Sequence, residues 1–269
     1  MTQLLVLSDL HLEFSDWTPD PDAVAQADIV VLAGDIHVGS QGIDWAVRTF
    51  PGKPCIYVIG NHELYSGNVS RTSLGIRAAA KATNIIVLDS DTWSTSAYGA
   101  GDPVRFIGTT LWTDFKLFGE SRTAVLGAMY HAKRHMTDFG TITFGTTGWM
   151  TPGQSVILHN AAVEYLKGRL AEPFVGKTVV VTHHLPSIRA VAPQFLEDPL
   201  SPAFASNLDD LVGKADLWIA GHTHVACDLP ADARGKGRIV INPRGYVHDM
   251  HSGGYAEQTG WDPRLVLDI

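Results

Sequence analysis

Five short patches of metal-binding residue types recur along this chain. They are Asp9-Leu10-His11, Gly34-Asp35, Gly60-Asn61-His62-Glu63, Thr182-His183-His184 and Gly221-His222-Thr223-His224. Carboxylates, imidazoles and the amide oxygen of asparagine are ligands that divalent metal ions accept in proteins. One such patch arises often by chance, but five patches in one chain indicate a metal site.

Each patch follows a short apolar run that is typical of a β-strand. The runs are Leu4–Leu7, Ile29–Ala33, Cys55–Ile59, Thr178–Val181 and Leu217–Ala220. Continuous runs rich in Val and Ile indicate strands that are buried on both faces. Open α/β sheets bind their ligands beyond the carboxyl ends of the strands. We therefore expect the five patches to meet along one edge of a sheet.

Counting the candidate ligands divides them into two sets. Residues two apart in an extended chain point the same way, so Asp9 and His11 can chelate one ion. Asp35 can bridge two ions, and paired metals ~3.5–4 Å apart are a recurring solution for phosphoester hydrolysis. The two sets share that carboxylate: Asp9, His11, Asp35 and His224 for one ion, and Asp35, Asn61, His183 and His222 for the other.

The donor types restrict the metal. Mixed nitrogen and oxygen ligation suits manganese, iron, zinc, nickel or cobalt better than calcium, and we favour manganese or iron. The absence of clustered thiolates argues against a closed structural zinc site. His184 replaces His183 as the ligand if the strand ends one residue later. Cys227, three residues past His224, is interpreted as a small residue leaving a strand rather than as a ligand.

Three residues are expected to contact a substrate: Asn61, His62 and Arg244. His62 lies next to the candidate ligand Asn61, and an imidazole titrates near neutrality, which suits a proton donor to the leaving group. Glu63 either orients His62 or begins the next helix. Arg244 follows the apolar run Arg238–Asn242. It either grips a phosphate oxygen or forms a structural ion pair.

Length and composition fit a globular protein with a sizeable core. The chain has 269 residues, is 45% hydrophobic and carries a net charge of −8 with neutral histidines. The acidic balance and the lack of a Lys/Arg run disfavour nucleic acid as a partner. No segment approaches the ~20 apolar residues of a membrane span. With no recognisable signal peptide and no disulfide framework from two cysteines, we expect a cytoplasmic protein.

Helical patterns alternate with the strand-like runs, which predicts a layered α/β fold. The expected helices are Gln41–Phe50, Ser70–Thr83, about Arg122–His135, Thr151–Leu170 and Asn207–Val212. Further expected strands are Asn84–Leu88, Val104–Gly108, Arg238–Asn242 and Arg264–Asp268. No linker or repeat divides the chain, so residues 1–269 are expected to form one domain. Irregular stretches at about 113–150 and 185–206 are interpreted as lids, with packing over the sheet edge as the alternative.

The ordered patches resemble the calcineurin-like metallophosphoesterase superfamily. Its pattern is D-x-H, G-D, G-N-H-D/E, a histidine and then G-H-x-H, and the match runs from residue 9 to residue 224. The resemblance implies a four-layer αββα sandwich with two central mixed β-sheets. It also implies a dinuclear centre bridged by Asp35 and a hydroxide, with His62 near the leaving-group oxygen. Many members continue G-D-x-x-D, whereas Val38 stands at the last position here, which removes no ligand but can alter a contact behind the ligands.

The resemblance names a chemistry and not a substrate. It implies a hydrolase of a small phosphoester, either a phosphodiesterase or a broad-specificity phosphatase, in which the bridging hydroxide attacks phosphorus in line. A nuclease or nucleotide pyrophosphatase is an alternative, although the acidic charge disfavours a nuclease. Two further hypotheses are a non-catalytic scaffold on the same fold and a metal-dependent hydrolase of carboxylic esters or amides.

Overall fold

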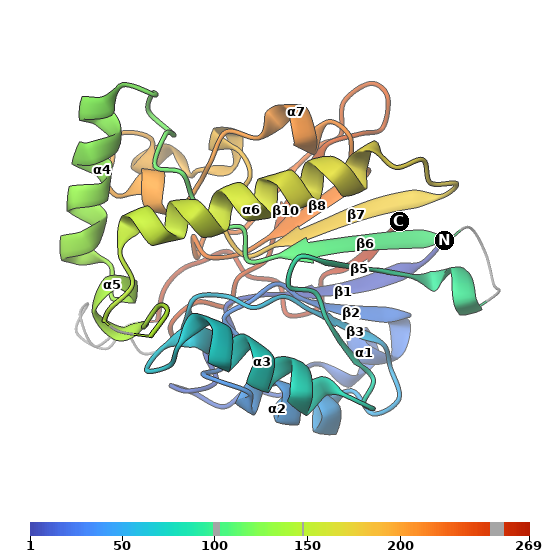
Figure 1. Ribbon diagram of the computed structural model, residues 1–269. Coiled ribbons are helices and arrows are strands. Elements are labelled where there is room, and N and C mark those ends of the chain that lie inside the picture. The colour runs from blue at the N-terminus through green and yellow to red at the C-terminus, as the bar shows by residue number, and fades with distance from the viewer. Residues whose placement is uncertain (99–102, 147, 248–255) are drawn as a thin grey trace.

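Two β-sheets lie face to face at the centre of the molecule, and helices cover the outer face of each sheet (Figure 1). The computed structural model describes residues 1–98, 103–146, 148–247 and 256–269. The expected α/β fold with two mixed sheets flanked by helices is confirmed. Among the described residues, no helix has the length and apolar character needed to cross a membrane.

The first sheet has the strand order β11-β1-β2-β3-β4. Its strands are β1 (Gln3–Leu7), β2 (Ile29–Leu32), β3 (Cys55–Tyr57), β4 (Ile85–Val87) and β11 (Val266–Asp268). Strands β1 to β4 are parallel, and β11 pairs antiparallel with β1. The carboxyl ends of β1, β2 and β3 therefore meet at one edge of this sheet. The expectation that one sheet carries all five patches was wrong, because the strands before the other two patches, β7 (Lys177–Thr182) and β8 (Leu217–Ala220), belong to the second sheet.

The second sheet has the order β5-β6-β7-β8-β10-β9. Its strands are β5 (Asp91–Ser94), β6 (Val104–Thr109), β7 (Lys177–Thr182), β8 (Leu217–Ala220), β9 (Cys227–Leu229) and β10 (Arg238–Ile241). The four central strands are parallel, while β5 and β9 pair antiparallel at the two edges. Strands β5 and β9 were not expected, because edge strands that carry exposed polar residues lack a continuous apolar run.

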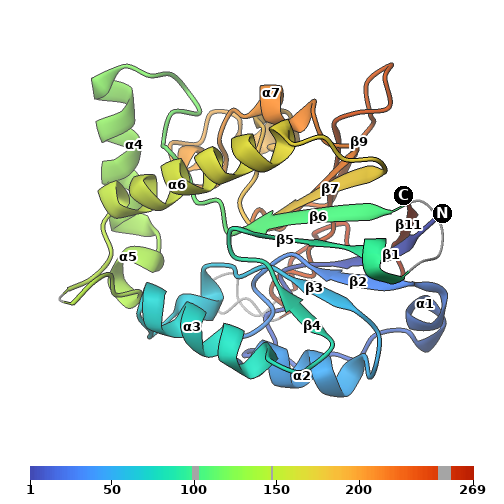
Figure 2. The ribbon, with the colours of Figure 1, turned by 45° about the vertical axis from the view of Figure 1, so that its right-hand side comes forward.

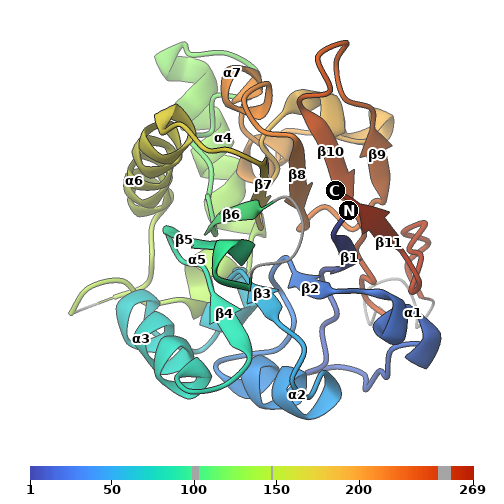
Figure 3. The ribbon, with the colours of Figure 1, turned by 90° about the vertical axis from the view of Figure 1, so that its right-hand side faces the viewer.

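The helices form the two outer layers (Figures 2 and 3). Helices α1 (Pro21–Gln26), α2 (Gln41–Thr49) and α3 (Val69–Ala80) lie over the first sheet, and α6 (Pro152–Ala171) and α7 (Asp209–Val212) over the second. Helices α4 (Arg122–His135) and α5 (Asp138–Thr141) stand at the end toward which β6 points. Helix α1 was missed, although Asp20 caps it and Pro21 opens it, both recognised start signals.

Alternate residues of each central strand enter different apolar cores, because side chains of a strand point to opposite faces in turn. Leu4 and Val6 of β1 belong to the core between the two sheets, together with Phe106 of β6. Leu5 and Leu7 belong to the core under α1, α2 and α3. Burial on both faces explains why the strands read as continuous apolar runs and fixes their carboxyl ends in place.

Candidate metal centre

The loops after β1, β2, β3, β7 and β8 bring the predicted ligands together. The side chains form three groups, and within each group the donor atoms lie within 4.8 Å of one another. The groups are Asp9, His11 and His224; Asp35, His183 and His222; and His11, Glu13 and His62. The first two contain six of the seven predicted metal ligands, and the third adds Glu13, which no motif had indicated.

Asp35 lies between these groups. Its Oδ1 is 3.3 Å from Nε2 of His183, and its Oδ2 is 4.0 Å from Nε2 of His11 and 3.9 Å from Nε2 of His62. Burial by itself raises the pKa of Asp35, but the neighbouring imidazoles, His183 first, outweigh it and hold the pKa well below its ordinary value. The two oxygens of one ionised carboxylate thus face different donor groups, as a bridging ligand requires.

Asn61 presents its amide oxygen to the same place. Its Oδ1 lies 2.9 Å from Nε2 of His183. Its Nδ2 donates to Oδ1 of Asp138 in α5 at 2.9 Å, and Tyr65 Oη donates to the same oxygen. Because Asp138 accepts the amide N–H, the amide oxygen of Asn61, which a metal ion would bind, faces His183.

Two observations indicate that these residues fit cations. Nε2 of His222 is buried and has no hydrogen-bond partner, which is costly unless another group occupies it. Nε2 of His11 lies 3.0 Å from Nε2 of His224, while their Nδ1 atoms contact Glu13 at 3.2 Å and Glu257 at 2.6 Å. Because the Nδ1–H groups are donated to these carboxylates, the two Nε2 atoms face each other, and one cation could bind both of them.

The backbone is left-handed at five of the seven predicted ligand positions. The φ angles are 50° at Asp9, 46° at His11, 56° at Asp35, 73° at His222 and 49° at His224. Such conformations cost residues other than glycine roughly 1–3 kcal/mol each and cluster at functional sites. Asp9 and His11 do belong to one donor group, as expected, but not because the chain is extended there. Both lie in the loop after β1, and its left-handed backbone brings their side chains together.

Two glycines leave room for the carboxylates. A Cβ atom on Gly60 would lie 2.1 Å from Oδ1 and 2.5 Å from the backbone nitrogen of Asp35. A Cβ atom on Gly221 would lie 2.6 Å from Oδ2 of Asp9. No side chain fits at such distances, so the glycines of the G-N-H-E and G-H-T-H patches allow one loop to approach the carboxylate of another.

Glu63 fastens the loops behind the ligands. Its carboxylate accepts from the backbone nitrogens of Asp35, Ile36 and Gly60 at 2.8–3.0 Å and from Tyr57 Oη at 2.7 Å. Burial, together with the charge of Asp35, raises the pKa of Glu63 to about 7. Glu63 lies in the 3₁₀ turn η1 (His62–Leu64). From this turn its carboxylate binds backbone nitrogens of the loops after β2 and β3.

His62 is oriented by Glu13 rather than by Glu63. Oε1 of Glu13 lies 2.8 Å from Nδ1 of His62, and Tyr246 Oη lies 3.1 Å from its Nε2. The ring of Tyr65 stacks on that of His62 with centroids 4.1 Å apart. Burial lowers the pKa of His62, but the charges of Asp35 and Glu13 outweigh it, and the net effect raises the pKa. Glu13 is thus the carboxylate that contacts the outer nitrogen of His62. The last position of the G-D-x-x-D pattern holds Val38 and supplies no carboxylate.

His183, rather than His184, faces Asp35. Nδ1 of His183 contacts the Ala33 carbonyl at 2.9 Å, which leaves its Nε2 toward Asp35 and Asn61. Nδ1 of His184 instead contacts the Thr110 carbonyl at 3.1 Å. Burial, aided by the neighbouring His183, lowers the pKa of His184 to about 3, so this ring is neutral at neutral pH.

Arg244 directs its guanidinium to the backbone of the loop after β1. Its guanidinium donates to the carbonyls of Leu10, Ser15 and Asp16 at 2.8–3.2 Å, and to the Ser15 hydroxyl at 3.2 Å. The side chain is buried, with 8% of its surface exposed. These contacts use the guanidinium to hold the loop that carries His11 and Glu13, not to face the cavity. The geometry therefore favours a structural role for Arg244, through carbonyl contacts rather than an ion pair.

A cavity of about 290 Å³ opens onto the donor groups. Its walls include Asp35, Asn61, His62, His222, His224 and Tyr246. His135, Met136 and Thr137, at the end of α4, line it as well, so the 113–150 stretch reaches the site. Cys227 starts β9 and belongs to none of the donor groups found among the described residues.

A set of histidines, carboxylates and one asparagine thus gathers at the strand ends of a two-sheet sandwich, in an arrangement that could hold metal ions. The chain belongs to the calcineurin-like phosphoesterase family, whose profile matches residues 2–226. No curated protein sequence matches it.

A solved structure shows the same architecture. A phosphopantetheinyl hydrolase from Mycobacterium tuberculosis has a TM-score of 0.69 at 18% sequence identity, over 91% of this chain and 90% of that chain. A dimetal phosphatase from Danio rerio has a TM-score of 0.44 at 16% identity, over 90% of this chain and 87% of that chain. The first similarity shows the fold, and the second is too low to show it.

Proposed function

We propose that this chain is a metal-dependent phosphoester hydrolase that uses two divalent transition-metal ions, with manganese or iron favoured. The observation that carries the proposal is the placement of Asp35, whose two oxygens face separate groups of buried histidines. The substrate is a small phosphoester, and the activity is that of a phosphodiesterase or a broad-specificity phosphatase. Family membership supports the reaction class, and the donor groups support the metal pair.

The donor groups suggest how the ions would be shared. Asp9, His11, Asp35 and His224 would hold one ion, and Asp35, Asn61, His183 and His222 the other. When bound, such a pair supplies hydroxide near neutral pH and neutralises the charge of the phosphate oxygens. The protein contributes the fixed geometry: Glu13, Glu257 and the Ala33 carbonyl hold the outer nitrogens of three histidines and so orient their inner nitrogens.

His62 is the proposed proton donor to the leaving group. Its Nε2 lies 3.9 Å from Oδ2 of Asp35 and lines the cavity. Glu13 accepts from Nδ1, which leaves Nε2 as the nitrogen that can deliver a proton to the departing alkoxide. Tyr246, 3.1 Å from that nitrogen, keeps the ring aimed at the cavity. General acid catalysis of this kind contributes ~10²–10⁴-fold.

Two further assignments follow from the contacts. We propose that Arg244 anchors the 10–16 loop in place of the predicted phosphate contact. Residues 113–150 are proposed to form a cover over the site within a single domain, since the end of α4 lines the cavity and Asp138 of α5 orients Asn61.

A substrate panel tests the proposal. The protein reconstituted with manganese or iron is assayed with phosphomonoesters, phosphodiesters, nucleotides and acyl esters. A phosphopantetheinyl ester is included because one structure of the same fold is a phosphopantetheinyl hydrolase. We expect hydrolysis of bis-p-nitrophenyl phosphate that a chelator abolishes, that added metal restores and that Asp35→Ala lacks. Turnover of acyl esters alone, or metal binding with no hydrolysis of any phosphoester, would contradict it.

A further inference from the structure

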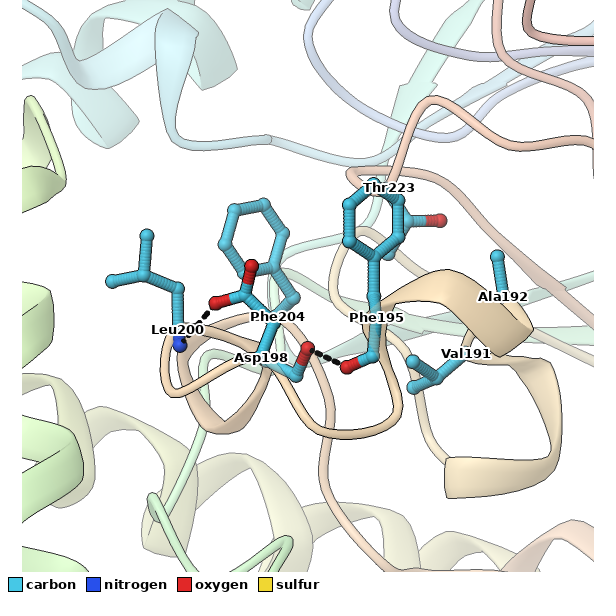
Figure 4. Close-up of a pocket in the computed structure, with 8 residues that line it drawn as sticks. Val191, Ala192, Phe195, Asp198, Leu200, Phe204 and Thr223 are labelled. Atoms are coloured by element: carbon cyan, nitrogen blue, oxygen red, sulfur yellow. Dashed lines mark hydrogen bonds between the residues drawn. The ribbon is translucent and has the colours of Figure 1, made fainter.

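An apolar cavity of about 190 Å³ lies beside the metal centre (Figure 4). Its walls come from the 191–204 segment and from one residue of the G-H-T-H patch. The lining residues are Val191, Ala192, Phe195, Asp198, Leu200, Ser201, Phe204 and Thr223. In Figure 4 the rings of Phe195 and Phe204 extend to the same side of the segment that carries them. The second irregular stretch of the sequence therefore builds a defined cavity.

This cavity shares a wall with the cavity of the metal centre. Phe204 and Thr223 line both. The ring of Phe204 lies 4.6 Å from that of His222, centroid to centroid, at an interplanar angle of 32°. Thr223 stands between His222 and His224, and its hydroxyl oxygen is buried without a hydrogen-bond partner. A phosphate held at the metal centre would thus lie directly beside an apolar compartment that carries one unused hydroxyl at its border.

The segment that forms the compartment is held in place by its own contacts. The backbone nitrogen of Leu185, just after His184, donates to the Phe204 carbonyl at 3.1 Å, and Ser206 donates back to Leu185 at 3.0 Å. Ser201 Oγ donates to the Phe195 carbonyl at 2.6 Å, and Oδ1 of Asp198 accepts from the backbone nitrogen of Leu200 at 2.8 Å. The compartment is therefore preformed, as ligand sites usually are.

We infer that this compartment receives the organic group of the phosphoester, and that this group is uncharged, mainly apolar and about the size of one aromatic ring. An empty cavity of ~150 Å³ lined by apolar side chains accepts benzene, so the volume here suits a substituted ring or a branched alkyl group. Of the lining residues, Asp198 alone carries a charge, and its carboxylate disfavours a second anionic group. A sugar would leave most of its hydroxyls without partners against Phe195, Leu200 and Phe204. The inference rests on the proposed function and narrows its substrate class.

Direct binding tests the inference without catalysis. Phenylphosphonate, methylphosphonate and 4-carboxyphenylphosphonate are titrated calorimetrically into the manganese-loaded protein. We expect phenylphosphonate to bind about tenfold or more tightly than methylphosphonate, because one ring is removed from water. The carboxyphenyl compound should bind more weakly than the phenyl compound. Equal affinity of the phenyl and methyl compounds, no binding of either, or tighter binding of the carboxyphenyl compound would overturn the inference.

Two variants locate the effect. Phe195→Ala removes one aromatic wall, and Leu200→Asp places a charge in the compartment; both should reduce the phenyl preference to about threefold or less and leave methylphosphonate binding unchanged. Leu196→Ala is the matched control, since Leu196 is 41% exposed beside the 40% exposed Phe195 and does not line the cavity. A phenyl preference that persists in both variants would place the ring elsewhere and overturn the inference.

The substrate panel separates this inference from the proposed function. Hydrolysis of phosphoesters without any phenyl preference in binding would leave the function standing and overturn the inference. A phenyl preference that Phe195→Ala and Leu200→Asp remove, in a protein that hydrolyses no phosphoester, would support the compartment and contradict the function.

Discussion

Asp138 controls the orientation of Asn61 from a distant part of the chain. It lies in α5, is buried, and its Oδ1 accepts from both Asn61 and Tyr65 at 2.9 Å. We expect Asp138→Ala to release the amide of Asn61 and to weaken metal binding by ~10-fold or more, the usual effect of losing a partner behind a ligand. Asp138→Asn keeps an acceptor oxygen and should retain most of the affinity. Metal titrations of both variants check this, and equal affinities in both would contradict it.

His62 is expected to act on protons without holding the ions. His62→Ala should slow hydrolysis of an alkyl phosphoester by ~10²–10⁴-fold. An ester with the good leaving group p-nitrophenolate should be affected much less, because that anion needs no proton. Metal content, measured by mass spectrometry of the purified variant, should match that of the unaltered protein. A uniform loss on both esters, or a loss of metal, would show that His62 serves another role.

Residues of the site divide into those that the sequence could predict and those that it could not. Each candidate ligand directly follows an apolar strand, and parallel strands end together, so their convergence was predictable. Glu13 and Glu257 reach the site from loops and Asp138 from the short helix α5, and nothing in their local sequence distinguishes them from surface carboxylates. Many family members carry an aspartate where this chain has Val38, which indicated a changed contact behind the ligands. The sequence did not show that Glu13 contacts His62.

At the scale of elements, the loop after β3 depends on a glycine. A methyl group at Gly60 would press on the backbone nitrogen and the carboxylate of Asp35. We expect Gly60→Ala to displace Asp35, to lower metal occupancy below one ion per chain and to destabilise the fold. Gly168→Ala is the matched control: it lies in α6 with open space around it and should stabilise by ~0.4–1 kcal/mol. Thermal melts and metal analysis compare the two, and full occupancy in Gly60→Ala would contradict the account.

The elements that the sequence predicted best are the ones with strong local signals. Helix α6 begins with the capping box of Thr151 and Gln154, with Pro152 in its first turn, and both ends lie within one residue of expectation. Strand β8 was predicted at its observed bounds. The short edge strands β5 and β9 escaped notice because neighbouring strands, not their own composition, create them.

At the scale of the whole molecule, Asp216 ties together the strand starts opposite the metal centre. It accepts from the backbone nitrogen of Thr178 and from the ammonium groups of Lys177 and Lys236 at 2.7–3.3 Å. Burial raises the pKa of Asp216, but the contacts with Lys236 and Thr178 outweigh it, and the net effect lowers the pKa. The carboxylate therefore stabilises the fold above its ordinary pKa near 4, and this contribution disappears as the pH falls through the lowered folded-state pKa.

Asp216→Asn should accordingly cost about 1–2 kcal/mol of unfolding free energy at pH 7. The difference from the unaltered protein should shrink at pH values below about 4, as the native carboxylate is protonated too. Denaturant unfolding at a series of pH values measures it, with phosphoesterase activity as the control that should not change. A difference that is independent of pH would show that the charge of Asp216 contributes nothing.

In the proposed centre, Asp35 joins two ions held by histidines from separate strand ends. Anomalous diffraction from crystals grown with manganese locates such ions themselves. We predict two peaks ~3.5–4 Å apart, one on each side of the Asp35 carboxylate. One peak should lie beside His11 and His224, and the other beside His183 and His222. A map with no peak beside Asp35, or with a single ion at full occupancy, would contradict the account.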